Sequence, residues 1–368
     1  MSHPALLRAV AAHGLAASTL GLPDGPLDDD AWADLLRGVR SQRLAGLLAE
    51  AVASGALEVT DSQLAEVIEL HRGAIGSVLL LERQLQHSSA ALDAAGIAHR
   101  AVKGAAFAHL DYPNPSWRHY GDVDVLLPTA ELDRAVEVLL TAGHERRNPP
   151  LRPGFEARFA KSVELRVGAN GAEVDLHRLL VPEPLGWWIV EGDLFAEPAA
   201  FALAGQAVPA PSRSVRFLHA CYHAALGFRP TRLVPLRDLV EAAGDPAFDW
   251  REAVTLAERW RGAPIVAHAV RTAMEAFALE PTGGLWWWAR GHRSDEPATR
   301  ILEHYLHGTR RQTERSLDAL RALPRWRDRA AYLSALLRPD RAYLEYRGVS
   351  AGDWWRQGAR SLERRLRR

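Results

Sequence analysis

The spacing of apolar residues divides the chain into two helical regions with a mixed segment between them. Apolar residues recur every three or four positions over 28–53 and 61–95, which predicts amphipathic helices. From 97 to about 180, short apolar runs alternate with helical stretches, and the helical period returns after Ser212. We therefore predict an α+β fold. It has a small mixed-sheet core at 96–211, between an N-terminal helical region at 1–95 and a C-terminal helical domain at 212–368.

The mixed segment carries the strand signals. Apolar runs and Gly or Pro boundaries predict four strands, at 97–102, 123–127, 155–167 and 172–176. A short helix is expected at 105–110, and a longer one, capped by Thr129, is expected to run to about Ala142. Beyond the core, helices are expected at 212–226, 233–243, 250–261, 263–278, 296–308, 312–322 and 325–337.

The sharpest chemical signal is Asp122-Val123-Asp124 at the start of a predicted strand. Side chains two positions apart on a strand project from the same face, so both carboxylates are expected on one side. Such close carboxylates repel unless a cation lies between them, and oxygen ligands suit Mg²⁺ or Mn²⁺. The alternative is a solvated strand end with two acids. On a later predicted strand, Asp175 or Glu173 could complete a three-carboxylate metal site, where Asp175 would orient or deprotonate an attacking hydroxyl.

Two lysines, Lys103 and Lys161, stand out because every other basic residue among the 45 is arginine. Lys103 and Gly104 end one predicted strand and open a helix that continues with Ala105. A glycine there lets backbone N–H groups approach a phosphate at the positive helix end, and Lys103 would add a compact charge. Lys161 could reach a phosphate or be exposed to solvent.

Four further residues have both a functional and a structural interpretation. Arg118 precedes the acid pair and could neutralise phosphate charge or form a surface ion pair. His177 shares the face of Asp175 and could orient a ligand or hydrogen-bond within the core. His219 and His223 share one face of a predicted helix. Zinc binding would require a third ligand and is disfavoured, which leaves core or substrate-pocket histidines.

Charge and cysteine content limit the functional classes. Lys+Arg and Asp+Glu both number 45, which excludes a protein that relies on non-specific attraction to nucleic acid. The single cysteine, Cys221, excludes an intramolecular disulfide and favours either a reducing compartment or a protein indifferent to redox conditions. No apolar run approaches the roughly 18 residues of a membrane span, and we find no signal peptide. We expect a cytoplasmic protein. Its arginine-rich end after 355 is interpreted as a solvated helix or tail, or alternatively as a phosphate or nucleic-acid contact.

The order of these motifs resembles the uncharacterised nucleotidyltransferase family of the DNA polymerase β-like superfamily. The motifs are Lys103-Gly104, Asp122-Val123-Asp124 and Val174-Asp175-Leu176-His177. The resemblance covers about residues 85–245 and includes His219-x-x-x-His223 and the later Asp238. It implies a triphosphate-binding turn at Gly104, a metal pair at Asp122 and Asp124, and a third acid at Asp175. Ala105 stands where the wider superfamily has Ser or Gly.

The combined prediction is a metal-dependent nucleotidyltransferase that moves a nucleoside monophosphate from an NTP to a hydroxyl or phosphate and releases pyrophosphate. Two Mg²⁺ or Mn²⁺ ions are expected on Asp122, Asp124 and Asp175. The acceptor is expected to be a small molecule, peptide or protein rather than nucleic acid, with no membrane partner. The predicted nucleotide-binding residues are Lys103, Gly104, Ala105, Arg118, Lys161 and His177, and the predicted substrate-binding residues are His219, His223 and Asp238.

Two alternatives to this function stay open. A glycosyltransferase also uses an Asp-x-Asp motif to hold a metal on a nucleotide sugar, but it needs neither Asp175 nor the Lys103-Gly104 turn. A non-catalytic adaptor on a degenerate nucleotidyltransferase scaffold is compatible with Ala105 in place of a hydroxyl residue.

Overall fold

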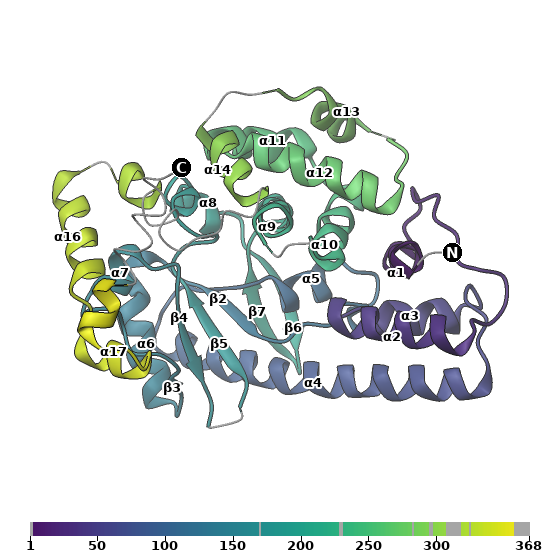
Figure 1. The fold of residues 1–368 in the computed structure, drawn as a ribbon, viewed down its shortest axis with the longest axis horizontal. Helices are drawn as coiled ribbons and strands as arrows, with labels where there is room; N and C mark the ends of the chain where they lie inside the picture. The colour runs from purple at the N-terminus through teal and green to yellow at the C-terminus, as the bar shows by residue number, and fades with distance from the viewer. Residues whose placement is uncertain are drawn as a thin grey trace.

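The acid-bearing strands lie at the centre of a five-stranded sheet with helices on both faces (Figure 1). The computed structural model describes residues 3–168, 171–227, 231–281, 283–293, 297–306, 318–323 and 325–356. The sheet order is β1-β2-β5-β4-β3, and β2 and β5 are parallel while the other neighbours are antiparallel. The bounds are β1 (Arg100–Val102), β2 (Val123–Leu126), β3 (Glu145–Arg146), β4 (Ser162–Arg166) and β5 (Glu173–His177).

Helices precede, interrupt and follow this sheet. Before it come α1 (His3–Ala12), α2 (Asp29–Gln42), α3 (Ala45–Ala53) and α4 (Asp61–Ala94). Within the core are α5 (Gly104–Leu110), α6 (Leu132–Thr141), α7 (Phe155–Phe159), α8 (Glu191–Phe195) and the hairpin of β6 (Ala199–Leu203) and β7 (Gln206–Ala210). After it come α9 (Arg213–Leu226), α10 (Leu233–Gly244), α11 (Trp250–Arg259), α12 (Ala263–Phe277), α13 (Gly284–Gly291), α14 (Pro297–Leu306), α16 (Trp326–Leu337) and α17 (Arg341–Tyr346). The predicted α+β class, with a small mixed sheet and helical flanks, is confirmed.

Alternation along the strands sends side chains into two different cores. Val123 and Val125 of β2 pack into the core that α4 and α6 cover. Leu126 of β2 and Val102 of β1 belong to the other core, which includes α9 and α10. Asp124 is the register partner of Val102 and lies two positions from Leu126, so it shares their face. The acids therefore face α9 and α10, which lie across the sheet from α4 in Figure 1.

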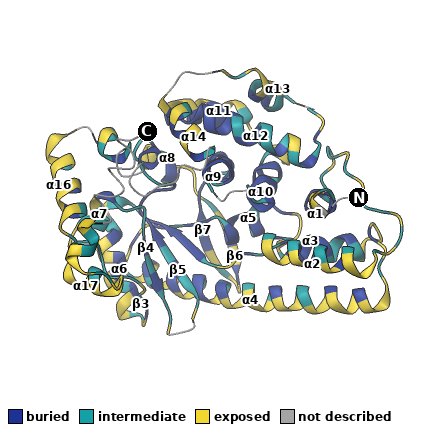
Figure 2. Ribbon diagram, viewed as in Figure 1, coloured by how far each residue is buried: buried dark blue, intermediate teal, exposed yellow. Residues whose placement is uncertain are grey.

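The core beneath α9 and α10 also contains the N-terminal helices. Residues of α2 and α3, such as Leu35 and Leu48, share this cluster with Phe217 of α9 and Val270 of α12. Figure 2 shows α9 and α10 almost entirely buried, whereas α4 exposes one side along much of its length. Hydrophobic burial thus joins regions that are distant in sequence. The division into three domains at residues 95 and 211 stays a prediction.

Three local predictions differ from the structure. The helix expected over 28–53 breaks at Arg43, whose φ of 59° is left-handed, and the Leu44 N–H bonds back to Val39 O. The segment expected as a strand over 155–167 begins with α7, and its strand starts at Ser162. Thr129 starts a short 3₁₀ turn and its hydroxyl donates to Glu191, so it caps no helix.

Two further sequence expectations concern residues beyond the described part of the chain. Most of the helix expected at 312–322 and the arginine-rich residues from 357 on lie outside the described residues. The β6–β7 hairpin was not among the predicted elements.

Candidate active site

Asp124 and Asp175 are neighbours across the parallel strands β2 and β5. Their Cα atoms are register partners, so both carboxylates stand on the same face of the sheet. His177, two positions beyond Asp175, is on that face too. One ligand atom from each of Asp124, Asp175 and His177 lies within 4.8 Å of the other two. Of the predicted metal ligands, Asp124 and Asp175 thus belong to one compact cluster, whereas Asp122 precedes β2 and is not a member of it.

Lys103 and His177 both contact the carboxylate of Asp124. The Lys103 ammonium forms an ion pair with Asp124 Oδ1, and His177 Nε2 lies 2.6 Å from the same oxygen. Asp124 and His177 side chains are each 1% exposed, and Lys103 is 16% exposed, so the lysine covers the other two. Nδ1 of His177 is buried without a hydrogen-bond partner among the described residues.

The three carboxyl groups of the site differ in their affinity for protons. Burial favours the neutral form of Asp124, but Lys103 and His177 outweigh it and hold the pKa well below the usual range. Burial and the charge of Asp124 raise the pKa of Asp122. The same two causes raise the pKa of Asp175 from 3.8 to about 7. The site therefore holds one firmly ionised acid beside two acids whose charged forms are disfavoured.

Lys161 lies at the same end of the sheet. Its carbonyl accepts hydrogen bonds from the N–H groups of Arg178 at 2.8 Å and Leu179 at 3.1 Å, which anchors it beside the end of β5. Burial, followed by repulsion from Lys103, lowers the pKa of Lys161 to about 8. The two lysines that stood out in the sequence thus flank the acid cluster together.

His219 and His223 lie one turn apart on α9, above the acids. Burial, followed by Lys103, lowers the pKa of both histidines, to about 3 for His223 and well below the usual value for His219. Both rings are therefore neutral at pH 7. Nδ1 of His223 is buried without a hydrogen-bond partner among the described residues. The pair presents neutral imidazoles to the site, with no third zinc ligand beside them in the described chain.

Arg118 and Asp238 contact each other. Arg118 Nε and Nη2 donate to the two oxygens of Asp238 at 2.6 and 2.9 Å, and the Tyr112 hydroxyl donates to Oδ1 at 2.9 Å. Both charged side chains are buried, with Asp238 fully excluded from solvent. This ion pair fastens α10 to the segment that leads into β2. Neither charge faces solvent. The predicted roles of Arg118 in nucleotide binding and of Asp238 in substrate binding stay predictions.

Gly104 lies against an aromatic ring. A Cβ at this position would come within 2.4 Å of Tyr120 Cγ and 2.5 Å of Tyr120 Cβ. Gly104 and Ala105 are both buried at the start of α5. The close packing of Tyr120 is therefore a second reason for glycine here, beside the phosphate approach inferred from the sequence.

The sequence interpretation missed two arginines near Asp122. Arg43 follows the last residue of α2, and Arg232 precedes α10. Arg43 opposes the effects of burial and Asp124 that raise the pKa of Asp122. No local motif marks either arginine, because the contacts that bring them to the site join segments far apart in sequence.

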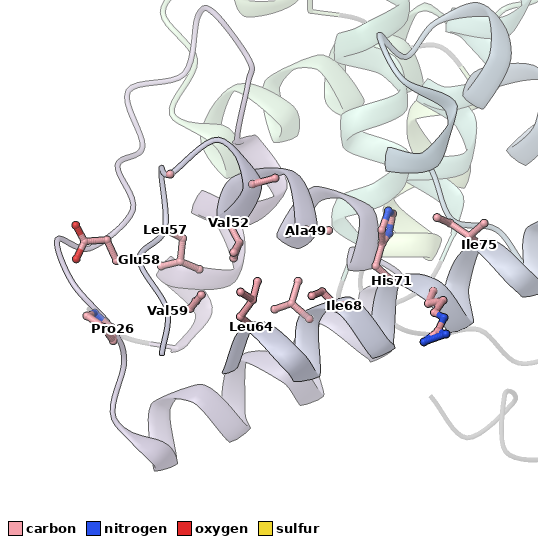
Figure 3. A pocket seen from close by; sticks show the side chains of 14 residues that line it. Pro26, Ala49, Val52, Leu57, Glu58, Val59, Leu64, Ile68, His71 and Ile75 are labelled. Carbon is pink, nitrogen blue, oxygen red and sulfur yellow. The ribbon is translucent and has the colours of Figure 1, made fainter. Parts of the chain in front are cut away.

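A pocket of about 760 Å³ lies elsewhere, between α4 and the segment that follows α3 (Figure 3). Its walls are mainly apolar and include Val52, Leu57 and Leu64, and none of the predicted site residues lines it. It is separate from the acid cluster.

No helix in the described ranges combines the length and apolar character that a membrane crossing requires.

A comparison with known families finds a nucleotidyltransferase family. The chain belongs to the family described as uncharacterised nucleotidyltransferase, whose model matches residues 28–278. The resemblance inferred from the motifs is therefore confirmed, and nucleotidyl transfer is the reaction class that the family supports. Comparison with curated proteins gives no match.

Two solved structures are distantly similar to this chain. One is the crystal structure of an antigenic nucleotidyltransferase-like protein from Paracoccidioides brasiliensis, with 15% identity and a TM-score of 0.33 over 54% of this chain and 93% of that one. The other is the solution structure of the antibiotic-resistance factor ANT(2'')-Ia, with 15% identity and a TM-score of 0.30 over 61% of this chain and 96% of that one. At these scores neither structure carries an argument about this protein.

Proposed function

We propose that the protein transfers a nucleoside monophosphate from an NTP to a hydroxyl or phosphate of a small molecule, peptide or protein. The observation that carries the proposal is the register of Asp124 and Asp175 on β2 and β5, with Lys103 paired to Asp124. In the reaction, the acceptor oxygen bonds to the α-phosphorus, the bond from that phosphorus to the bridging oxygen breaks, and pyrophosphate leaves.

The donor set suits a divalent cation. Hard carboxylate oxygens predominate, and the ligand atoms of Asp124, Asp175 and His177 lie within 4.8 Å of one another. We propose that Asp122, Asp124 and Asp175 hold Mg²⁺ or Mn²⁺, with two ions in the active form and His177 beside them. When bound, the ions would neutralise charge on the transferred phosphoryl group and its leaving group.

Residues of the chain would transfer the proton, bind the phosphates and bind the acceptor. Asp175 would orient the acceptor hydroxyl or accept its proton. Lys103 and Lys161 would hold phosphate oxygens as point charges. The neutral His219 and His223 would line the acceptor pocket, where the unpartnered Nδ1 of His223 offers a hydrogen bond.

The remaining assignments rest on the resemblance or act through other residues. Gly104 and Ala105 would form the triphosphate turn, as the resemblance implies. Arg118 and Asp238 would support the site through their buried ion pair rather than by contact with substrate. A cytoplasmic location stays a prediction from the single cysteine, Cys221, which is buried and free.

A thermal-shift panel tests the proposed function. The four NTPs and several UDP-sugars would be added with and without Mg²⁺ or Mn²⁺, to the wild type and to an Asp122→Asn/Asp124→Asn double variant. A ligand at about 100 times its Kd adds about 2.7 kcal/mol of stability, so binding is readily visible. We expect a metal-dependent NTP shift that the double variant loses.

The other outcomes identify the alternatives. A shift with UDP-sugars alone, with full activity retained in Asp175→Asn, would indicate the glycosyltransferase. No shift with any nucleotide would indicate the adaptor. Transfer activity that survives in both the Asp122→Asn and the Asp124→Asn variant would end the proposal.

A further inference from the structure

A hydrogen bond between distant segments brings two arginines to the acid cluster. The side chain of Gln42 accepts from the Leu233 N–H at 3.0 Å, which joins the end of α2 to the start of α10. Arg43 follows Gln42, and Arg232 precedes Leu233. The two arginines are therefore held near each other where the N-terminal and C-terminal helices meet.

The guanidinium of Arg43 lies directly against the backbone that leads into Asp122. A Cβ on Gly121 would lie 2.5 Å from Arg43 Nη2 and 2.8 Å from its Cζ, so glycine is what allows this approach. Within the described part of the chain, the Arg43 guanidinium has no hydrogen-bond or ion-pair partner. Its donors are thus available beside the first acid of the Asp-x-Asp motif.

The backbone of Arg43 gives no reason for an arginine at this position. Its φ of 59° is the left-handed conformation that ends many helices, and glycine or asparagine adopts it at less cost. The helix end alone would therefore favour glycine or asparagine over arginine. A function for the guanidinium accounts for its presence.

Arg43 and Arg232 both act electrostatically on Asp122. Burial lowers the pKa of Arg232, Arg43 lowers it further, and Asp122 opposes both effects. The two guanidinium groups repel each other, and an anion held by both would relieve the repulsion. A phosphate matches the planar fork of arginine with paired hydrogen bonds.

The two ends of the acid cluster differ in charge. At the far end, Glu164 of β4 is the register partner of Asp175, so a further carboxylate stands beside the third acid. A chain of phosphates is therefore better accommodated at the Asp122 end, beside Arg43 and Arg232.

We propose that Arg43 and Arg232 bind the β- and γ-phosphates of the NTP, the part that leaves as pyrophosphate. This inference rests on the proposed function and extends it. It places the β- and γ-phosphates where the N-terminal and C-terminal helical regions meet. The α-phosphate and the acceptor then lie toward Asp124 and Asp175. Binding of the triphosphate would also tie α2 to α10.

Calorimetric titration with Mg²⁺-pyrophosphate, the four NTPs and the matching NMPs tests the proposal. The variants are Arg43→Gly, which keeps the left-handed backbone, and Arg232→Gln. Arg40→Ala, which removes an exposed arginine from the last turn of α2, is the matched control. We expect pyrophosphate and NTP to bind at least about tenfold more weakly to each variant, with NMP affinity changed less than about twofold.

Each other result counts against the assignment. Unchanged affinity for NTP and pyrophosphate in both variants would overturn it, as would equal losses for NTP and NMP. If the wild type binds NTP through Asp122 and Asp124 while the arginine variants match it, the proposed function stands and this inference fails. If the wild type binds no nucleotide, both fail. The melting temperature of Arg43→Gly without ligand, expected at or above that of the wild type, checks that the variant is folded.

Discussion

Lys103 and Asp124 form a buried ion pair at the centre of the acid cluster, so this chain supplies its own cation to the aspartate that the motif assigns to a metal. Lys103 directly follows β1, the strand beside β2, and Asp124 is the register partner of Val102, the last residue of β1. Because His177 contacts the same oxygen, Asp124 stays ionised in a buried position. The site is thus charged and arranged before any substrate binds.

Replacement of Lys103 by methionine tests this arrangement. Lys103→Met keeps most of the side-chain volume but leaves the Asp124 charge buried without its ion pair, which should destabilise the protein by roughly 3–5 kcal/mol. Mn²⁺ should then raise the melting temperature of the variant more than that of the wild type. Lys161→Met is the control, because Lys161 has no ion pair within the described residues. Equal Mn²⁺ shifts in all three proteins would contradict the role given to Lys103.

The Asp175→Asn variant should gain stability while it loses activity. The folded-state pKa of Asp175 is about 7, above its ordinary 3.8. Stability contributed by a raised pKa is present below the ordinary pKa and is lost as the pH rises through 7. Removal of the carboxylate should therefore stabilise the protein by roughly 1–3 kcal/mol at pH 8 and by much less at pH 5.

Urea unfolding at both pH values measures this effect of Asp175, beside an assay of nucleotide transfer. A variant that is less stable at pH 8 than the wild type would show that the carboxylate is favourably partnered. Retained transfer would remove Asp175 from the mechanism.

Substitution of Asp238 tests whether this residue positions other residues or binds substrate. Asp238→Asn breaks the buried two-point contact with Arg118, which should cost roughly 3–5 kcal/mol of stability. The double variant with Arg118→Met should recover part of that loss, because no buried charge is then left unpaired. Glu258→Gln, at an exposed position on α11, is the control in the same unfolding measurement. Unchanged stability together with a raised KM would instead favour direct contact with substrate.

Gly104→Ala tests whether this glycine serves packing. The added Cβ would meet the Tyr120 side chain at 2.4–2.5 Å, so we expect a loss of roughly 1–3 kcal/mol in thermal or urea unfolding. Gly73→Ala on the exposed face of α4 meets nothing within 4 Å and should gain roughly 0.5–1 kcal/mol. A Gly104→Ala variant of normal stability that no longer binds NTP would instead support a role in phosphate approach alone.

The periodicity of apolar residues was enough to predict many of the strands and helices from the sequence alone. Alternation along 123–127 and 172–176 predicted two strands with their acids on one face, and β2 and β5 confirm the strands. Period-3.6 spacing predicted α4 and α9–α12 to within about two residues at each end. These predictions succeed because strand and helix geometry is fixed by neighbours along the chain.

Two structural features were beyond the reach of local sequence patterns. The left-handed turn at Arg43 interrupts an apolar spacing that continues through it, so the break between α2 and α3 could not be predicted from periodicity. The chemistry of Arg118 was also ambiguous, because its partner Asp238 lies 120 positions away. In both cases the sequence permitted two structures, and packing decided between them.

The sequence by itself thus determined the mixed sheet, the helical flanks and the acids that share one face of the sheet. Only the tertiary structure decided what surrounds those acids. It pairs Lys103 with Asp124, buries Arg118 against Asp238, and brings Gln42 to Leu233 across 191 positions so that Arg43 and Arg232 reach Asp122. The physical reason is that side-chain direction along a strand or helix is a local property. The contact between two helices instead depends on the burial of apolar surface from the whole chain.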